Sequence, residues 1–261
     1  MRAVRPHAWL LVLVVGVVLF EVLRRTLVAT DNPNLIPALL LLGAATVPVT
    51  FVVFIRGRRL DYSVGGGTVA LVALVGGVVG VATAGILEYD VLHDLGALPS
   101  AGVGLIEEAA KLIAPLAVLI FTRYRRPADG LLAGVASGAG FAALETMGYA
   151  FVTLVNSQGN LAAVDGILLI RGLLSPAAHM AWTGLTAAAL FSAAAQQWST
   201  AAIGRLIATY LVAAGLHAAW DGIGGILAYV VIGVISLGLL TVTAHRFAVD
   251  DRREHGALLT A

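Results

Sequence analysis

Long apolar runs follow one another along almost the whole chain, and they restrict the possible folds more than any other feature. A helix that crosses a bilayer needs about 20 mostly apolar residues. Segments of about this character lie at residues 8–23, 35–55, 65–87, 101–121, 131–154, 173–195, 201–221 and 224–246. The last two lie close together, so seven spans are an alternative. The sequence predicts an all-α fold, a polytopic membrane bundle of about eight transmembrane helices.

Composition supports a membrane environment and limits the chemistry that the chain can perform. Hydrophobic residues make up 59% of the chain and charged residues 12%, whereas a typical soluble domain is about 25% charged. The mean hydropathy is +0.94. There is no cysteine, which excludes disulfides, thiolate zinc sites and a cysteine nucleophile. Any metal must therefore be held by His, Asp or Glu, and the net charge of +1 gives no indication of nucleic-acid binding.

Basic residues gather at alternate ends of the predicted spans. One side receives Arg2, Arg5, Arg56, Arg58, Arg59, Arg123, Arg125, Arg126, Arg205, Arg246, Arg252 and Arg253. The other side receives Arg24, Arg25 and Arg171, together with the acidic loop 88–94. Because positively charged loops stay in the cytoplasm, both termini are predicted to be cytoplasmic. We expect one integral membrane domain over residues 1–261, with 247–261 as a short cytoplasmic tail.

Several ionisable side chains fall inside the predicted spans, where they are costly and therefore candidates for function. They are Glu107, Glu108 and Lys111 in the fourth span, Glu145 in the fifth, His179 in the sixth, and His217 and Asp221 in the seventh. At about 1.5 Å per residue, the glutamates lie roughly 10–13 Å below the surface opposite the termini. Four predicted helices thus place acids and imidazoles at similar depth. Residues 101–221 are expected to form a four-helix catalytic core region.

The spacing of these residues favours one shared site. Lys111 lies four residues after Glu107 and three after Glu108, so one ammonium can meet either carboxylate on the same helix face. Asp221 lies four residues after His217, so both can point at one site. Two histidines with several carboxylates and no thiols fit a catalytic zinc shell. Such a shell has three protein ligands and a water, and here a carboxylate is left over as general base.

Other interpretations of the same residues remain open. The glutamates and lysine can form a structural ion pair, His179 can be a core histidine with satisfied hydrogen bonds, and His217 with Asp221 can be a self-contained pair. At the level of function, the alternatives are a proton-coupled transporter that uses a buried Glu/His relay and a non-catalytic membrane scaffold. A transporter would show pH-driven flux without proteolysis.

Three motifs resemble those of a known family. EEAAK at 107–111 is similar to the EExxK motif of the PrsW family, FAALE at 141–145 to its FxxxE, and HAAWD at 217–221 to its HxxxD. His179 falls where the family has a further isolated histidine. The resemblance covers about residues 100–225. PrsW proteins are multi-pass intramembrane proteases, distantly similar to the CAAX prenyl protease and bacteriocin-immunity superfamily, which has EExxxR and FxxxH instead.

The resemblance implies roles for these residues. Glu107 or Glu108 would activate water for attack on a peptide carbonyl, and spacing does not decide between them. Glu145, His179 and His217 would hold a divalent metal, expected to be zinc, or orient that water, and Asp221 would ligate the metal or orient His217. The implied partner is a membrane-protein substrate, such as a single-span anti-sigma factor cut on its outer side. The implied location is the cell membrane.

Overall fold

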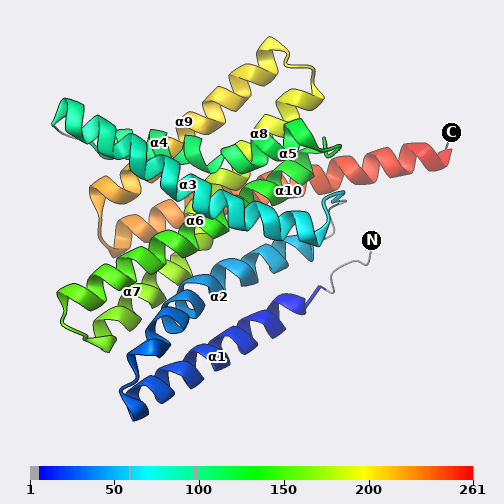
Figure 1. Ribbon diagram of the computed structural model, residues 1–261. Helices are drawn as coiled ribbons and strands as arrows, with labels where there is room; N and C mark the ends of the chain where they lie inside the picture. Colours follow the sequence, from blue (N-terminus) through cyan, green and yellow to red (C-terminus); the bar gives the residue numbers. More distant parts are fainter. Residues whose placement is uncertain (1–5, 59, 61, 97–98, 261) are drawn as a thin grey trace.

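The computed structural model describes residues 6–58, 60, 62–96 and 99–260, and over this part of the chain all regular structure is helical (Figure 1). Arg2, Arg5 and Arg59, which were predicted to lie on the cytoplasmic side, are outside the described residues. The α-helices are α1 (Ala8–Thr30), α2 (Ile36–Arg56), α3 (Gly66–Leu95), α4 (Ser100–Lys111), α5 (Ile113–Phe121), α6 (Pro127–Asn156), α7 (Leu161–Leu174), α8 (His179–Ala195), α9 (Thr200–Ile223) and α10 (Ile226–Thr260). Two 3-10 turns, η1 (Pro33–Leu35) and η2 (Ser175–Ala177), precede α2 and α8. The predicted polytopic helical bundle is confirmed.

Six segments of the described chain are long and apolar enough to cross a membrane. They are Pro33–Arg56, Gly66–Leu95, Pro127–Asn156, Leu161–Ala195, Thr200–Ile223 and Ile226–Val249. The other two predicted spans are also helical, but neither is a helix of the required length and apolar character. The helix α1 carries Glu21, Arg24 and Arg25 in its second half, and the predicted span 101–121 is divided at Leu112 into α4 and α5.

The division between α4 and α5 has a cause in the sequence. Pro115 lacks the N–H that would donate to the carbonyl of Lys111 four residues earlier. The hydroxyl of Ser137 on α6 donates to this carbonyl instead, at 2.6 Å. A buried backbone oxygen thereby keeps a hydrogen-bond partner. The helix α4 therefore ends at Lys111 inside the bundle.

The predicted sixth span begins earlier than residue 173. In the structure, α7 starts at Leu161 and is separated from α8 by η2. Pro176 lies in this turn and cannot continue the helical hydrogen-bond pattern. His179 is consequently the first residue of α8, 18 residues after Leu161. It is buried inside the bundle, in the second half of the apolar segment Leu161–Ala195.

The helix α6 is central, because it packs against both α3 and α8. Glycines permit both contacts. A Cβ added at Gly138 would lie 2.5 Å from the carbonyl oxygen of His179, and one at Gly77 would lie 2.8 Å from that of Gly140. Small residues of this kind let helix backbones approach closely within a membrane. The contact of α6 with α8 thus fixes the position of His179.

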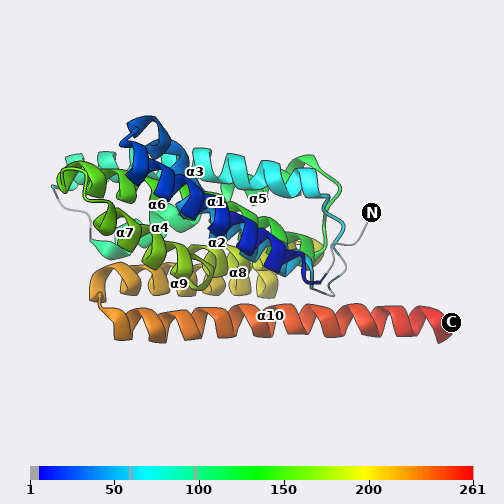
Figure 2. The ribbon, with the colours of Figure 1, turned by 90° about the horizontal axis from the view of Figure 1, so that it is seen from below.

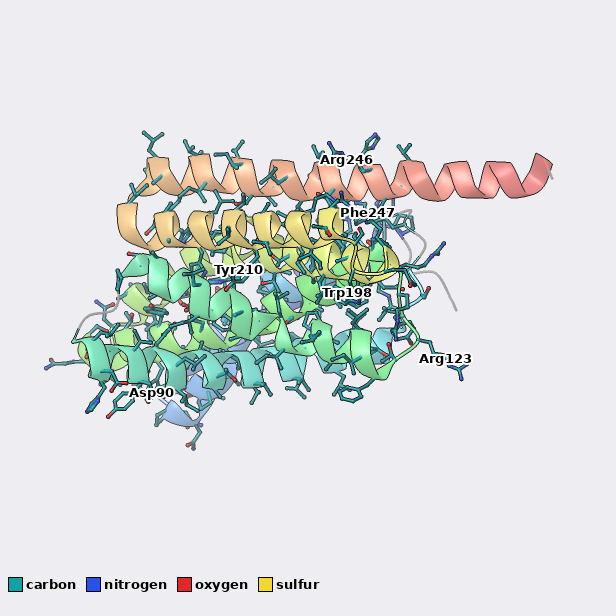
Figure 3. All side chains as sticks on the ribbon, turned by 90° about the horizontal axis from the view of Figure 1, so that it is seen from above. Asp90, Arg123, Trp198, Tyr210, Arg246 and Phe247 are labelled. Carbon is teal, nitrogen blue, oxygen red and sulfur yellow. The ribbon has the colours of Figure 1, made fainter. Side chains whose placement is uncertain are left out.

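The start of α1 and the end of α10 lie on the same side of the bundle, which is called the termini side below (Figure 2). Arg123 lies toward this side, and Asp90 lies at the opposite end (Figure 3).

The last two predicted spans, which lie close together in the sequence, are separate helices. Gly224 and Gly225 form the turn between them, with φ of 66° and 85°. Glycine adopts this left-handed backbone region readily. The helix α10 is a single long helix along one face of the bundle (Figure 2).

The contact between α6 and α8 can be tested with a matched pair of alanine substitutions on α6. Gly138→Ala should lower stability by about 1–3 kcal/mol, because the added methyl overpacks the interface. Gly148→Ala has nothing within 4 Å of the new Cβ and should change stability by less than about 1 kcal/mol. Thermal unfolding of both variants in detergent measures the difference. Equal melting temperatures for the two variants would refute the close contact.

Candidate active site

The glutamates and lysine of α4 form a buried cluster. The Lys111 ammonium donates to Glu107 Oε2 and to Glu108 Oε1, both at 2.9 Å. Lys111 is fully buried, Glu108 is 1% exposed and Glu107 7%. Burying charges is favourable only where each finds a partner. The spacing in the sequence predicted that one ammonium can meet either carboxylate, and in the structure it contacts both.

His217 on α9 joins this cluster. Its Nδ1 lies 3.0 Å from Glu108 Oε1. Its Nε2 lies 3.4 Å from Glu107 Oε2 and 3.4 Å from Asp221 Oδ2. The approach of α9 depends on Gly104, where an added Cβ would lie 2.6 Å from the carbonyl oxygen of Ala214. Packing of α4 against α9 therefore brings the first and last predicted motifs into contact.

His179 completes the cluster from α8. Its Nδ1 lies 2.7 Å from the Lys111 ammonium, which donates to it. Its Nε2 lies 3.0 Å from Glu145 Oε2 on α6. The structure thus brings together all the residues that the sequence singled out.

Sequence reasoning missed Arg171 as a member of this site. On α7, its guanidinium lies 2.8 Å from Glu145 Oε2. With the sixth span predicted to begin at 173, Arg171 was expected to be only a loop charge on the side opposite the termini. The available signal was the position of an arginine within the apolar run 161–174.

Glu88 is a second residue whose position was predicted wrongly. It was assigned to an acidic loop, but α3 continues to Leu95 and includes it. It lies one turn after Ala84, which packs against Ala110 and Phe141. Residues four apart share a helix face, so Glu88 lies on the α3 face directed toward α4. Its Oε1 is buried without a hydrogen-bond partner among the described residues.

Aromatic rings surround the histidines. Trp182 stacks on His217 with ring centroids 4.9 Å apart, and its Nε1 donates to Ser236 Oγ at 2.8 Å. Phe141 lies 5.6 Å from the His179 ring and 4.2 Å from the Lys111 ammonium. These rings fix the histidine planes and keep bulk solvent from the charged groups. Charges interact more strongly in such a low-dielectric environment.

A small cavity lies beside His179. Its volume is about 70 Å³, and its wall includes Thr146, Arg171, Trp220 and Tyr229. A water molecule needs roughly 10–15 Å³ of such space, so the cavity can hold a few waters. Water can therefore be stored next to the charged cluster.

The donor atoms of Glu107, His179 and His217 converge. One ligand atom from each lies within 4.8 Å of the other two, and all three residues are buried. Two ligands of a tetrahedral zinc lie about 3.3 Å apart, since each is about 2.0–2.1 Å from the ion. The 3.4 Å between His217 Nε2 and Glu107 Oε2 agrees with that spacing. The residues present thus fit a divalent metal held by nitrogen and oxygen donors.

A polytopic helical bundle with buried carboxylates and histidines around such a site defines a membrane-embedded, metal-dependent enzyme. Residues 64–245 match the model of the PrsW family of intramembrane metalloproteases, and the chain belongs to this family. Searches of curated proteins and of solved structures gave no match. The chain is therefore a multi-pass membrane protein and an intramembrane protease. Its family implies a divalent metal and membrane-protein substrates in a lipid bilayer.

The charge balance of the cluster can be tested by removing its cation. Lys111→Met leaves two buried carboxylates without their ammonium and should lower stability by about 3–5 kcal/mol. Adding Glu107→Gln and Glu108→Gln to the same chain should restore much of the loss, because the buried negative charges are then gone. Thermal unfolding in detergent compares the variants. An unchanged melting temperature in Lys111→Met would show that the ion pairs do not stabilise the fold.

Proposed function

We propose that this protease hydrolyses a peptide bond of a membrane-associated substrate in the half of the bilayer opposite the termini. The observation that carries the proposal is a set of contacts between three helices: the glutamate pair of α4 meets His217 of α9, and Lys111 of α4 meets His179 of α8. General base, metal donors and a charge-neutralising lysine are held within hydrogen-bond reach of one another. This combination is suited to water-activated hydrolysis.

We propose that Glu107, His179 and His217 hold the metal, which we take to be zinc. When bound, a divalent metal polarises a carbonyl and makes water more acidic. Glu145 contacts Nε2 of His179 and would orient that ring, because carboxylates behind metal-binding histidines fix their orientation. The metal would then take Nδ1 of His179, in place of the Lys111 ammonium that contacts this atom in the structure. Asp221 lies on the same side of His217 as Glu107 and would orient His217 or add a further oxygen donor.

This assignment leaves Glu108 as the general base. Its Oε1 accepts hydrogen bonds from Lys111 and His217, whereas its Oε2 contacts only the Thr183 hydroxyl, at 3.4 Å, among the described residues. Oε2 would take a proton from the water that attacks the scissile carbonyl, and the carboxyl would return it to the leaving amine. Lys111 would balance the charge of the two carboxylates throughout.

The depth of the site supports its location in the membrane. Glu107 lies seven residues from the start of α4, and His217 lies six residues from the end of α9. Both helix ends are on the side opposite the termini, so the site is roughly 10 Å from that end at about 1.5 Å per residue. If the arginine-rich side is cytoplasmic, cleavage takes place toward the outer leaflet. A single-span regulator such as an anti-sigma factor would present its chain there.

Metal content separates the proposed roles. Purified protein should carry about one zinc per chain, and His179→Ala, His217→Ala and Glu107→Gln should each lose most of it. Glu108→Gln should keep the metal and lose proteolysis, because a base has been removed and a ligand has not. The control His93→Ala changes an exposed histidine and should keep both. Zinc is counted by elemental mass spectrometry.

The opposite pattern for the two glutamates, with metal lost in Glu108→Gln and retained in Glu107→Gln, would reverse their roles. Retention of zinc in both histidine variants would refute the metal site.

Activity and substrate can be tested together by comparing membrane proteomes. Cells with the wild-type chain should contain a cleaved membrane protein that stays intact in cells with Glu108→Gln or His217→Ala. Both variants must accumulate to wild-type levels for the comparison to count. The proposed reaction would be contradicted if no membrane protein is cleaved more in wild-type cells than in the variant cells while the wild-type protein is folded.

A further inference from the structure

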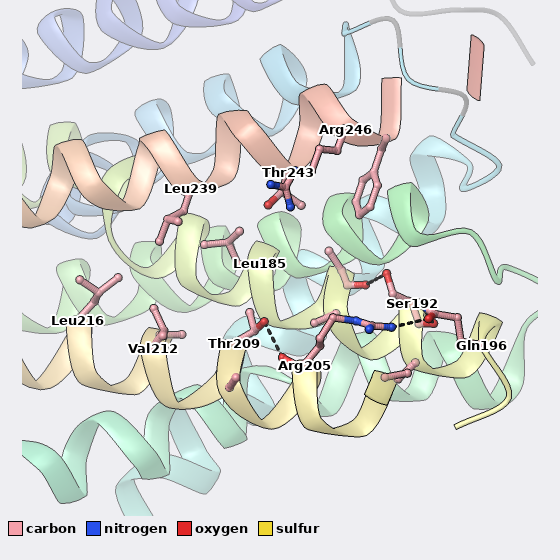
Figure 4. A pocket seen from close by; sticks show the side chains of 17 residues that line it. Leu185, Ser192, Gln196, Arg205, Thr209, Val212, Leu216, Leu239, Thr243 and Arg246 are labelled. Atoms are coloured by element: carbon pink, nitrogen blue, oxygen red, sulfur yellow. Dashed lines mark hydrogen bonds between the residues drawn. The ribbon is translucent and has the colours of Figure 1, made fainter. Parts of the chain in front are cut away.

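A groove separate from the catalytic cluster runs between α8, α9 and α10 (Figure 4). Its volume is about 420 Å³. The side nearest the chain termini is polar and includes Gln196, Arg205 and Arg246, whereas Leu216 and Leu239 form part of the apolar wall. Among the described residues that line it, none is acidic.

The two arginines of the groove are available for a ligand. Both are exposed. Arg205 is held by Gln196 and Arg246 has no ion pair within the part of the chain that the structure describes. Arg205 lies five residues after the start of α9, and Arg246 three residues before the end of the membrane span of α10. At about 1.5 Å per residue, both are within roughly 8 Å of these ends, the depth at which arginines reach lipid headgroups.

The apolar part of the groove has the length of one leaflet. Arg205 and Leu216 both line it and are 11 residues apart on α9, which corresponds to roughly 16 Å. Half of the bilayer hydrocarbon is about 15 Å thick. An acyl chain whose headgroup meets the arginines would therefore end near Leu216.

The order of charge and apolar surface along the groove matches a phospholipid. Two arginines stand at one end, and apolar side chains form the wall beyond them. A phospholipid joins an anionic headgroup to a flexible apolar chain in the same order.

We propose that this groove binds an anionic phospholipid of the leaflet on the termini side, with its phosphate at Arg205 and Arg246 and one acyl chain along α9. Basic pockets between transmembrane helices on the cytoplasmic side are suited to anionic headgroups. The two arginines, with no acidic side chain in the described part of the lining, supply the charge complementarity.

Native mass spectrometry of the full-length protein in nonionic detergent tests the proposal. The probes are phosphatidylglycerol and phosphatidylcholine with identical acyl chains. The wild-type protein should retain one phosphatidylglycerol in preference to phosphatidylcholine. Arg205→Gln/Arg246→Gln should weaken this binding roughly thirtyfold, because each arginine near an anionic headgroup contributes on the order of a fivefold preference.

Two controls separate this site from general charge effects. Arg123→Gln/Arg125→Gln removes the same charge from the same side of the bundle and should keep the preference. Ala208→Phe adds a ring to an exposed position of the groove wall and should reduce lipid retention while both arginines remain. Equal loss in the Arg123/Arg125 variant, or unchanged retention in Ala208→Phe, would overturn the proposal.

The acyl chain itself is tested by replacing the lipid with inorganic phosphate. Phosphatidylglycerol should raise the melting temperature of the wild-type protein, and phosphate at the same concentration should not. An equal rise with phosphate would identify an anion site without a lipid chain. Equal retention of phosphatidylcholine and phosphatidylglycerol would show that the arginines do not select the headgroup. Either result would overturn the proposal.

Discussion

The buried ammonium of Lys111 is the interaction on which the site depends. It donates to Glu107 and Glu108 on its own helix and to His179 on another. Without it, two carboxylates would lie side by side within a membrane, where each unpaired charge is costly. The ammonium neutralises much of that charge and joins α4 to α8. The cluster therefore stabilises the fold as well as preparing the chemistry.

Close helix packing brings the remaining groups to this ammonium. Gly104 allows α9 to deliver His217, and Gly138 allows α8 to deliver His179. Helix breaks place the other groups. Pro115 causes α4 to end at Lys111, and the turn that contains Pro176 causes α8 to begin at His179. Proline and glycine, which weaken isolated helices, here determine where the reactive side chains lie. The catalytic core thus combines close helix contacts at Gly104 and Gly138 with helix breaks at Pro115 and Pro176.

Much of this arrangement could be predicted from the sequence. The apolar runs indicated the helical membrane bundle, and the i,i+4 spacing of Glu107 with Lys111 indicated a shared face. The motif positions on four helices indicated that these residues meet. What could not be predicted depends on where helices break and extend. Arg171 and Glu88 were placed outside the site because α7 and the end of α3 were assigned to loops, and hydropathy alone does not show helices that continue past an apolar run.

The positions of metal donors were likewise beyond the sequence. Spacing shows which side chains share a helix face, but the choice among four carboxylates depends on distances between helices. In the structure, Glu145 Oε2 contacts Arg171 and His179, whereas Glu107 Oε2 accepts from Lys111 and lies 3.4 Å from His217 Nε2. The account of the site as a metal centre is based on this difference between carboxylates.

X-ray absorption spectroscopy of the purified, zinc-loaded protein shows whether two histidines and carboxylate oxygens hold the metal. The account predicts a shell of nitrogen and oxygen ligands at about 2.0–2.2 Å, with the multiple-scattering signal of two imidazoles. His179→Ala and His217→Ala should each reduce that signal to one imidazole or abolish binding. A zinc shell without imidazole scattering, or one unchanged in both variants, would contradict the account.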